Sequence, residues 1–171
     1  MNRIGMNIRT LIVDDEPLAR QRLKRFLDPA SDIELLTECG DGKAAVTAIR
    51  EYKPDLVFLD VQMPHLNGFE VLSAVGVEGM PVVIFVTAFD AFALQAFEAQ
   101  ALDYLLKPFG QDRVQKALER ARTFLEGNAK KSFQDHLAGL LRATEASRHT
   151  ARVLVRNGDR VLVVGPAEID W

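Results

Sequence analysis

The sequence contains a single cysteine, Cys39, so no internal disulfide can form and disulfide-rich secreted scaffolds are excluded. No apolar run approaches the roughly 20 residues of a membrane-spanning helix, and the N-terminal MNRIGMNIRT lacks the apolar core of a signal peptide. The formal net charge over 171 residues is −3, so no overall positive field favours nucleic acid. We therefore expect a cytoplasmic protein without a membrane segment.

Short apolar segments do occur, and they alternate with longer amphipathic ones. The apolar segments are rich in Val, Ile, Leu and Phe and cover residues 8–13, 33–38, 55–60, 81–87 and 101–107. Such runs are typical of parallel strands that helices cover on both faces. Helical patterns follow them, beginning near residues 17, 42, 69, 91 and 109, and Asp90 is placed to cap a helix that ends near Ala99. This order predicts an open α/β sheet with right-handed crossovers.

The pattern changes after Gly127-Asn128, and we place the end of a first domain, residues 6–126, at this point. Residues 127–150 contain a new amphipathic pattern and predict a helical linker. The segment RVLVRNGDRVLVV (152–164) predicts a β-hairpin around its Asn-Gly pair. Because an isolated hairpin is only marginally stable in water, we expect residues 151–171 to begin a second domain that is incomplete here.

Polar residues stand at the carboxyl ends of four predicted strands. Residues 14–16 (Asp-Asp-Glu) follow the first strand, Asp60 ends the third, Thr87 the fourth and Lys107 the fifth. Each alone has an ordinary explanation as a helix cap, a turn residue or a solvated side chain. Ligands bind beyond the carboxyl ends of the strands in open α/β sheets, so their joint occurrence favours one site.

Crowded carboxylates repel one another unless a cation lies between them. Asp14, Asp15 and Asp60 suit a hard divalent cation, Mg²⁺ foremost, and with Mg²⁺ one carboxylate can attack phosphorus to form an aspartyl phosphate. The Thr87 hydroxyl and the Lys107 ammonium can then balance the charge that grows on the phosphoryl oxygens. Asp60 stands alone on a central strand and is the predicted nucleophile.

These motifs resemble the receiver domain of two-component response regulators. The matching residues are DDE after the first strand, FLDVQMP around Asp60, VTA at 86–88 and YLLKPF at 104–109, within about residues 6–125. The resemblance implies a flavodoxin-like (βα)5 fold with parallel strand order 2-1-3-4-5. It also implies that a phosphohistidine on a sensor histidine kinase donates the phosphoryl group to Asp60. Such a protein is a phosphoacceptor in signalling, not an enzyme that turns over an external substrate.

The resemblance also assigns metal ligands. It implies that Asp15 binds Mg²⁺ directly, that Asp14 binds it through water, and that Asp60 and the backbone carbonyl of Gln62 complete the protein ligands. The Lys107-Pro108 peptide bond is expected to be cis, as is usual in the family.

A switch is implied as well. Thr87 and Lys107 would contact the phosphoryl group, and Tyr104 holds the position of the family's aromatic switch residue. Phosphorylation would then draw Thr87 inward, turn Tyr104 and remodel the surface of the fourth helix, the fifth strand and the fifth helix. That surface is expected to form a homodimer on activation.

The stretch FDAFALQAFEAQALDYLLKPF (89–109) is similar to receivers that carry a LytTR-type DNA-binding domain, and residues 152–171 resemble the first strands of that domain. The resemblance implies a transcription regulator that reaches DNA through the complete output domain. Because most of that domain is absent, this chain by itself is expected to bind DNA poorly or not at all.

Three alternative functions fit the sequence less well. Phosphatases with an aspartyl nucleophile often carry a second Asp two residues later, where this chain has Gln62. A nucleotide- or flavin-binding module needs a Gly-rich loop after the first strand, where the acidic DDEPLAR stands. A single-domain receiver that signals only by protein contact is the main alternative, and the predicted hairpin disfavours it.

Overall fold

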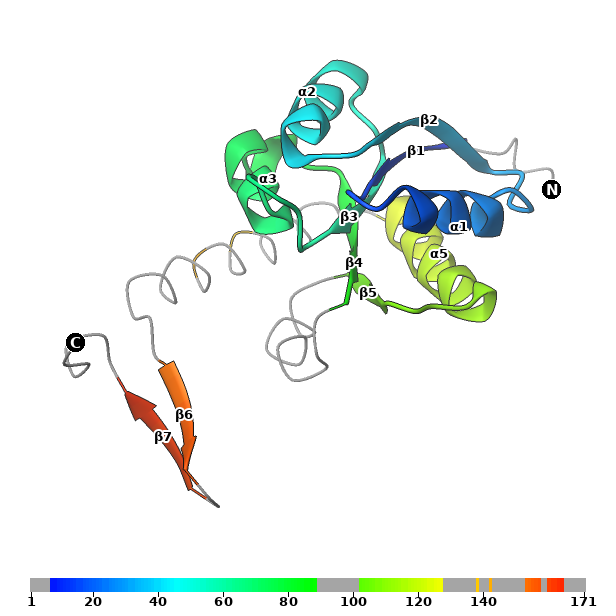
Figure 1. The fold of residues 1–171 in the computed structure, drawn as a ribbon. Coiled ribbons are helices and arrows are strands. Elements are labelled where there is room, and N and C mark those ends of the chain that lie inside the picture. The colour runs from blue at the N-terminus through cyan, green and yellow to red at the C-terminus, as the bar shows by residue number, and fades with distance from the viewer. Residues whose placement is uncertain are drawn as a thin grey trace.

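A computed structural model describes residues 7–88 and 102–127, the segments 153–157 and 160–164, and positions 138 and 142. Within these ranges a parallel sheet has the order β2-β1-β3-β4-β5, which confirms the predicted flavodoxin-like topology (Figure 1). The strands are β1 (Ile8–Val13), β2 (Ile33–Cys39), β3 (Leu56–Asp60), β4 (Val82–Thr87) and β5 (Asp103–Leu106). The helices are α1 (Pro17–Leu27), α2 (Gly42–Tyr52), α3 (Gly68–Val75), the short 3-10 helix η1 (Val77–Gly79) and α5 (Gln111–Glu126).

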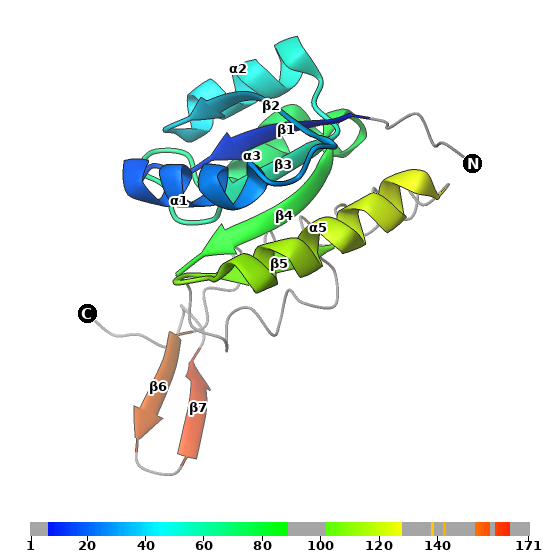
Figure 2. The ribbon, with the colours of Figure 1, turned by 90° about the vertical axis from the view of Figure 1, so that its right-hand side faces the viewer.

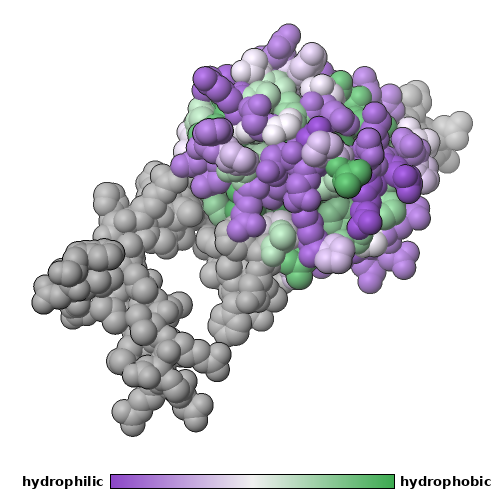
Figure 3. Space-filling view, in the orientation of Figure 1, coloured by the Kyte–Doolittle hydropathy of each residue, from purple (hydrophilic) through white to green (hydrophobic). Residues whose placement is uncertain are grey.

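The helices cover both faces of the sheet. α1 packs beside α5 on one face, and α2 packs beside α3 on the other (Figures 1 and 2). The central strands are therefore buried on both sides, and Leu11, Phe58 and Ile84 have no exposed surface. Burial on both sides is the reason that these strands are continuously apolar and not alternating. The side of the domain shown in Figure 3 is largely hydrophilic, with small separate apolar patches.

Local capping residues set the starts of α2 and α3. The Asp41 carboxylate accepts the Ala44 N–H at 2.7 Å, and Asn67 and Glu70 form a reciprocal capping box at the start of α3. The start of α1 differs, because Glu16 is its N-cap residue but makes no side-chain cap bond. The Glu16 carboxylate is turned instead toward the carboxyl edge of the sheet.

The remaining predictions have mixed outcomes. The cis Lys107-Pro108 bond is confirmed, and β6 (Val153–Asn157) pairs antiparallel with β7 (Arg160–Val164), which confirms the hairpin. The predicted helix 90–99 and residues 1–6 lie outside the described residues. Of the predicted linker only positions 127, 138 and 142 are described, and the latter two are helical. η1 was not predicted. Among the described residues, no helix has the length and apolar character needed to cross a bilayer.

A charged pair joins α5 to the start of β2. The Arg122 guanidinium donates two hydrogen bonds to the Asp32 carboxylate, from Nε to Oδ2 at 2.5 Å and from Nη2 to Oδ1 at 2.7 Å. Both side chains are only partly buried, which limits what the pair contributes. The hydrogen bonds from Arg122 lower the pKa of Asp32 below its ordinary value of 3.8.

We predict that Asp32→Asn lowers the free energy of unfolding at neutral pH by about 1 kcal/mol. Because the folded-state pKa of Asp32 is lowered, the pair stabilises the fold above pH 3.8 and loses this effect as pH falls through the folded-state pKa. Chemical denaturation at pH 7 and near pH 2 therefore gives a difference that disappears in acid. Asp28→Asn serves as the control, because Asp28 is an exposed carboxylate four residues earlier in the chain. A difference of equal size at both pH values contradicts the prediction.

Candidate functional site

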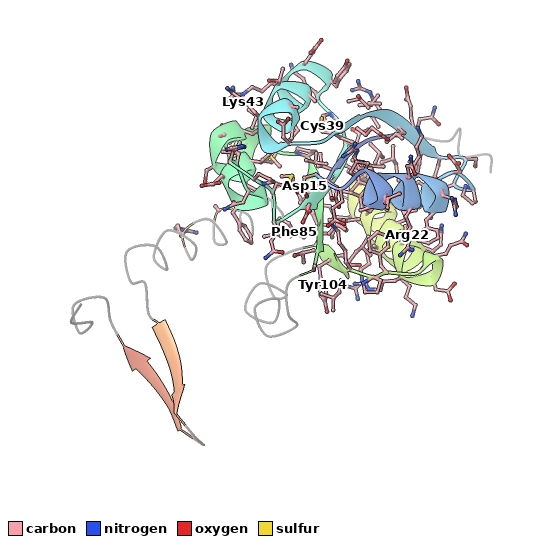
Figure 4. The ribbon with its side chains drawn as sticks, viewed as in Figure 1. Asp15, Arg22, Cys39, Lys43, Phe85 and Tyr104 are labelled. Atoms are coloured by element: carbon pink, nitrogen blue, oxygen red, sulfur yellow. The ribbon has the colours of Figure 1, made fainter. Side chains whose placement is uncertain are left out.

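The sheet register brings the predicted polar residues to one edge. Val13 lies opposite Leu59, Asp60 opposite Val86, and Thr87 opposite Leu106, so the strands β1, β3, β4 and β5 end side by side. In Figure 4 the labels Cys39 at the end of β2, Asp15 just after β1, Phe85 on β4 and Tyr104 on β5 follow one another from top to bottom. The edge therefore holds polar side chains from four strands that are far apart in sequence.

An ammonium group lies at the centre of this site. Lys107 Nζ is 2.8 Å from Asp14 Oδ2, 3.1 Å from Glu16 Oε1 and 3.3 Å from Asp60 Oδ2. Asp14 and Asp60 are 3% and 2% exposed, whereas the Glu16 side chain is 63% exposed. Burying two carboxylates is costly without a positive partner, and Lys107 is that partner in this structure.

The backbone N–H, the backbone carbonyl and the carboxylate of Asp14 each have a polar partner. Its N–H donates to the Cys39 carbonyl at 3.0 Å, and its carbonyl accepts the Arg20 guanidinium at 2.6 Å. One carboxylate oxygen accepts the Glu16 N–H at 2.9 Å, and the other faces Lys107. The position of Asp14 thus depends on contacts with the end of β2, with α1 and with the residue that follows β5.

Asp60 is fixed from the side of α3. Its Oδ1 accepts the Gln62 N–H at 3.0 Å. Gly68, the first residue of α3, lies against its backbone, and a Cβ added at Gly68 would be 2.6 Å from the Asp60 carbonyl oxygen. Real Cβ atoms do not approach a carbonyl that closely, so only glycine lets α3 begin here without moving Asp60.

The electrostatic balance of the site is incomplete. Burial, followed by the charge of Asp14, raises the pKa of Asp60 to about 7, and Lys107 only partly opposes this shift. Burial acts to lower the pKa of Lys107, but its hydrogen bond to Asp14 and the charges of Asp60 and Asp14 outweigh burial and raise it. One ammonium does not neutralise this many carboxylates, and the site would be stabilised by a further cation.

The side chains present fit a hard divalent cation. Asp14, Asp15, Glu16 and Asp60 each offer a carboxylate oxygen, and these oxygens all lie within 4.8 Å of one another. The ligands of octahedral Mg²⁺ lie about 2 Å from the ion, so its ligand pairs are up to about 4 Å apart. Oxygen-only donors and a spread close to this size match Mg²⁺ better than a soft metal.

A family model described as "Response regulator receiver domain" matches residues 10–119. The chain belongs to this family. Among its relatives is the transcriptional regulatory protein BtsR of Escherichia coli K12, which is 47% identical over 115 residues, 67% of this chain and 48% of BtsR. An uncharacterized response regulatory protein of Shewanella oneidensis is 45% identical over 122 residues, 71% of this chain and 52% of that protein. The chain spans about half the length of these curated relatives.

Solved receiver structures have the same fold. The signal receiver domain of NarL from Mycobacterium tuberculosis superposes with a TM-score of 0.59 and 32% identity, covering 68% of this chain and 97% of that one. The receiver domain of AraT from Geobacillus stearothermophilus superposes with a TM-score of 0.62 and 31% identity, covering 71% and 97%.

The two predicted switch residues of this receiver lie on β4 and β5. Thr87 is fully buried, and its carbonyl accepts the Lys107 N–H at 2.8 Å. Tyr104 is half-buried, the guanidinium of Arg113 lies 5.5 Å from its ring centroid, and Arg113 also donates to its carbonyl at 2.6 Å. The roles of Thr87 and Tyr104 in switching stay predictions.

Three residues of this region were not predicted as part of the site: Arg20, Gly68 and Arg113. In the sequence, Arg20 and Arg113 occupy ordinary polar positions of two predicted amphipathic helices. Gly68 belongs to the Asn-Gly pair at the predicted start of another helix. Their contacts join residues that are apart in sequence, so no local pattern could have revealed them.

We predict that Asp60→Asn stabilises the metal-free receiver at pH 8 by roughly 1–3 kcal/mol. The pKa of Asp60 is about 7 in the folded state against an ordinary value of 3.8, so the folded state binds more protons between these values. The free energy of unfolding of the native protein therefore falls as pH rises through this window, and that of the variant does not. Denaturation in EDTA at pH 5 and pH 8 measures the effect, and a stabilisation that is the same at both pH values contradicts it.

Proposed function

We propose that this receiver accepts a phosphoryl group on Asp60, in a reaction that depends on Mg²⁺ and uses a phosphohistidine of a sensor histidine kinase as donor. The observation that carries this proposal is the buried Asp60 carboxylate within 3.3 Å of Lys107 Nζ, in a cluster with Asp14, Asp15 and Glu16. A lone surface aspartate has neither the ammonium nor the neighbouring acids.

In the proposed reaction an Asp60 carboxylate oxygen forms a bond to phosphorus, and the bond between phosphorus and the histidine nitrogen breaks. Mg²⁺, held by Asp14, Asp15, Asp60 and the Gln62 carbonyl, would neutralise charge on the carboxylates and the phosphoryl oxygens. Lys107 exchanges part of its pairing with Asp60 for a phosphoryl oxygen, and the Thr87 hydroxyl donates to another. No general base is required, because Lys107 and a bound Mg²⁺ would together hold the attacking carboxylate in its anionic form.

The kinase partner would approach along α1. A hollow beside Lys107 is bordered by α1 and the segment before α5, and its lining includes Leu18, Ala19, Arg22, Arg25, Pro108 and Phe109. Leu18 is 78% exposed, which is unusual for a large apolar side chain of this domain. This surface includes Lys107, which contacts Asp60, and is suited to bind a kinase partner.

We predict that acetyl phosphate and Mg²⁺ add one phosphoryl group to the chain, on the peptide that contains Asp60. Mass spectrometry with EDTA as a parallel sample tests both the residue and the metal. Asp60→Asn should abolish the label, because the asparagine amide has no carboxylate oxygen with which to attack phosphorus. Asp55→Asn, at the opposite end of the same segment and bonded to Arg9 N–H at 2.9 Å, is the matched control and should keep it. Labelling that persists in Asp60→Asn would falsify the proposal.

The whole protein is proposed to regulate transcription in the cytoplasm. The relative BtsR bears the name of a transcriptional regulatory protein, and the β6–β7 hairpin follows the receiver here, as the resemblance to a LytTR-type output domain implies. DNA would be bound through the complete output domain and not through this chain. The proposed boundaries are 6–126 for the receiver, 127–150 for the linker and 151–171 for the start of the output domain.

Phosphorylation is proposed to act through a surface that includes β5 and α5, together with the predicted fourth helix, which lies outside the described residues. Thr87 and Tyr104 lie on neighbouring strands, with Phe85 opposite Tyr104 and Thr87 opposite Leu106 in the register. A Thr87 side chain drawn toward the phosphoryl group would leave room for the Tyr104 ring and change this face. A homodimer formed there would place two output domains on a two-fold DNA site.

We predict that beryllofluoride with Mg²⁺ converts the receiver from monomer to dimer in sedimentation velocity, because it imitates the phosphoryl group on Asp60. Asp60→Asn with the same reagents is the control and should stay monomeric. An unchanged mass in the native protein would reject dimerisation and favour the alternative of a receiver that signals by protein contact alone, while leaving the phosphoacceptor assignment in place.

A further inference from the structure

Arg20, on the first turns of α1, reaches back over the acidic loop that precedes the helix. Its Nη1 donates to the Asp14 carbonyl at 2.6 Å, and its Nε lies 3.6 Å from Glu38 Oε1 near the end of β2. The Arg20 side chain is 17% exposed. A Cβ added at Gly40 would lie 3.4 Å from Nη1, so the loop after β2 also borders the guanidinium. Arg20 thus joins α1 to the ends of both β1 and β2.

This position is not explained by stability alone. Among the described residues, Nε of Arg20 is the only buried side-chain nitrogen or oxygen without a hydrogen-bond partner. An unpaired buried N–H costs free energy, and the ion pair with Glu38 is too long to be a hydrogen bond. Sites that tolerate such a cost are typically constrained by function.

We propose that Arg20 is the positioning residue of the acidic loop, which holds the Asp14 backbone so that the Asp14 and Asp15 carboxylates converge with Asp60 on a divalent cation. This inference rests on the proposed function, because it concerns the same Mg²⁺ site. The Asp14 carbonyl has Arg20 as its partner, and the Asp14 carboxylate is oriented by the N–H of Glu16 two residues later. Without Arg20 the Asp14 carbonyl loses its hydrogen bond, the peptide between Asp14 and Asp15 is less restrained, and the two carboxylates converge less well.

The proposal predicts an effect opposite in sign to that of simple electrostatics. Arg20 is a positive charge close to a cation site, so charge alone repels Mg²⁺, and its removal should strengthen Mg²⁺ binding. A positioning role predicts the reverse, because groups that orient metal ligands typically raise metal affinity by 10–100-fold. The direction of the change therefore separates the two explanations.

The test is the Mg²⁺ affinity of the full chain, measured by isothermal titration calorimetry for the native protein, Arg20→Ala and Arg20→Lys. We expect Mg²⁺ to bind roughly 10-fold more weakly to Arg20→Ala. Arg20→Lys keeps the charge but loses the forked guanidinium, and its affinity should lie between the other two. Equal or tighter binding to Arg20→Ala overturns the proposal.

Arg50→Ala is the matched control. Arg50 also donates from its guanidinium to a backbone carbonyl at 2.6 Å, but that carbonyl belongs to Ala74 at the far end of α3. Its loss should leave Mg²⁺ affinity unchanged, whereas an equal fall in both variants would show a general effect of arginine loss and overturn the proposal. If Arg20→Ala does not fold, Arg20→Lys and Glu38→Gln decide, and native affinity in both overturns it.

A second measurement needs no metal. The Glu16 N–H is bonded to Asp14 Oδ1, so its hydrogen exchange reports the order of the loop. We expect Arg20→Ala to increase that exchange rate several-fold, with no increase in Arg50→Ala. If the native protein binds no Mg²⁺ while the Glu16 amide still depends on Arg20, the proposed function fails and the positioning role stands.

Discussion

The site depends on one interaction, the contact of the Lys107 ammonium with the buried carboxylates of Asp14 and Asp60 at 2.8 and 3.3 Å. Two carboxylates this close in a dry environment would repel each other strongly, and the raised pKa of Asp60 shows that the ammonium only partly compensates. Lys107 therefore reduces the repulsion between the two carboxylates but leaves the site with excess negative charge. That excess suits the binding of a divalent cation, and it links the stability of the receiver to its proposed chemistry.

The elements around this contact restrict its geometry from several sides. Gly68 lets α3 start directly against the Asp60 carbonyl, and Arg20 binds the carbonyl of Asp14 from α1. Lys107 directly follows β5 and precedes a cis proline, and its N–H is bonded to the Thr87 carbonyl. In the proposed function, a phosphoryl group on Asp60 would thus contact Lys107 and Thr87, whose backbones are hydrogen-bonded to each other.

A second charged group lies at the start of β5. The Asp103 carboxylate is almost fully buried and pairs with Arg113, whose guanidinium also faces the Tyr104 ring and its carbonyl. Arg113 thus joins the proposed switch residue Tyr104 to α5.

The sequence by itself determined the alternation of strands and helices, the strand order through its receiver motifs, and the residues that meet at the carboxyl edge. It could do so because apolar runs and their polar ends are local features, and parallel strands bring their ends together. Only the tertiary structure decided that Glu16 turns to Lys107 instead of capping α1, that Gly68 must be glycine, and that Arg20 holds Asp14. These depend on distances between segments, which follow from the packing of α1 and α3 on the sheet and leave no periodic signal in the chain.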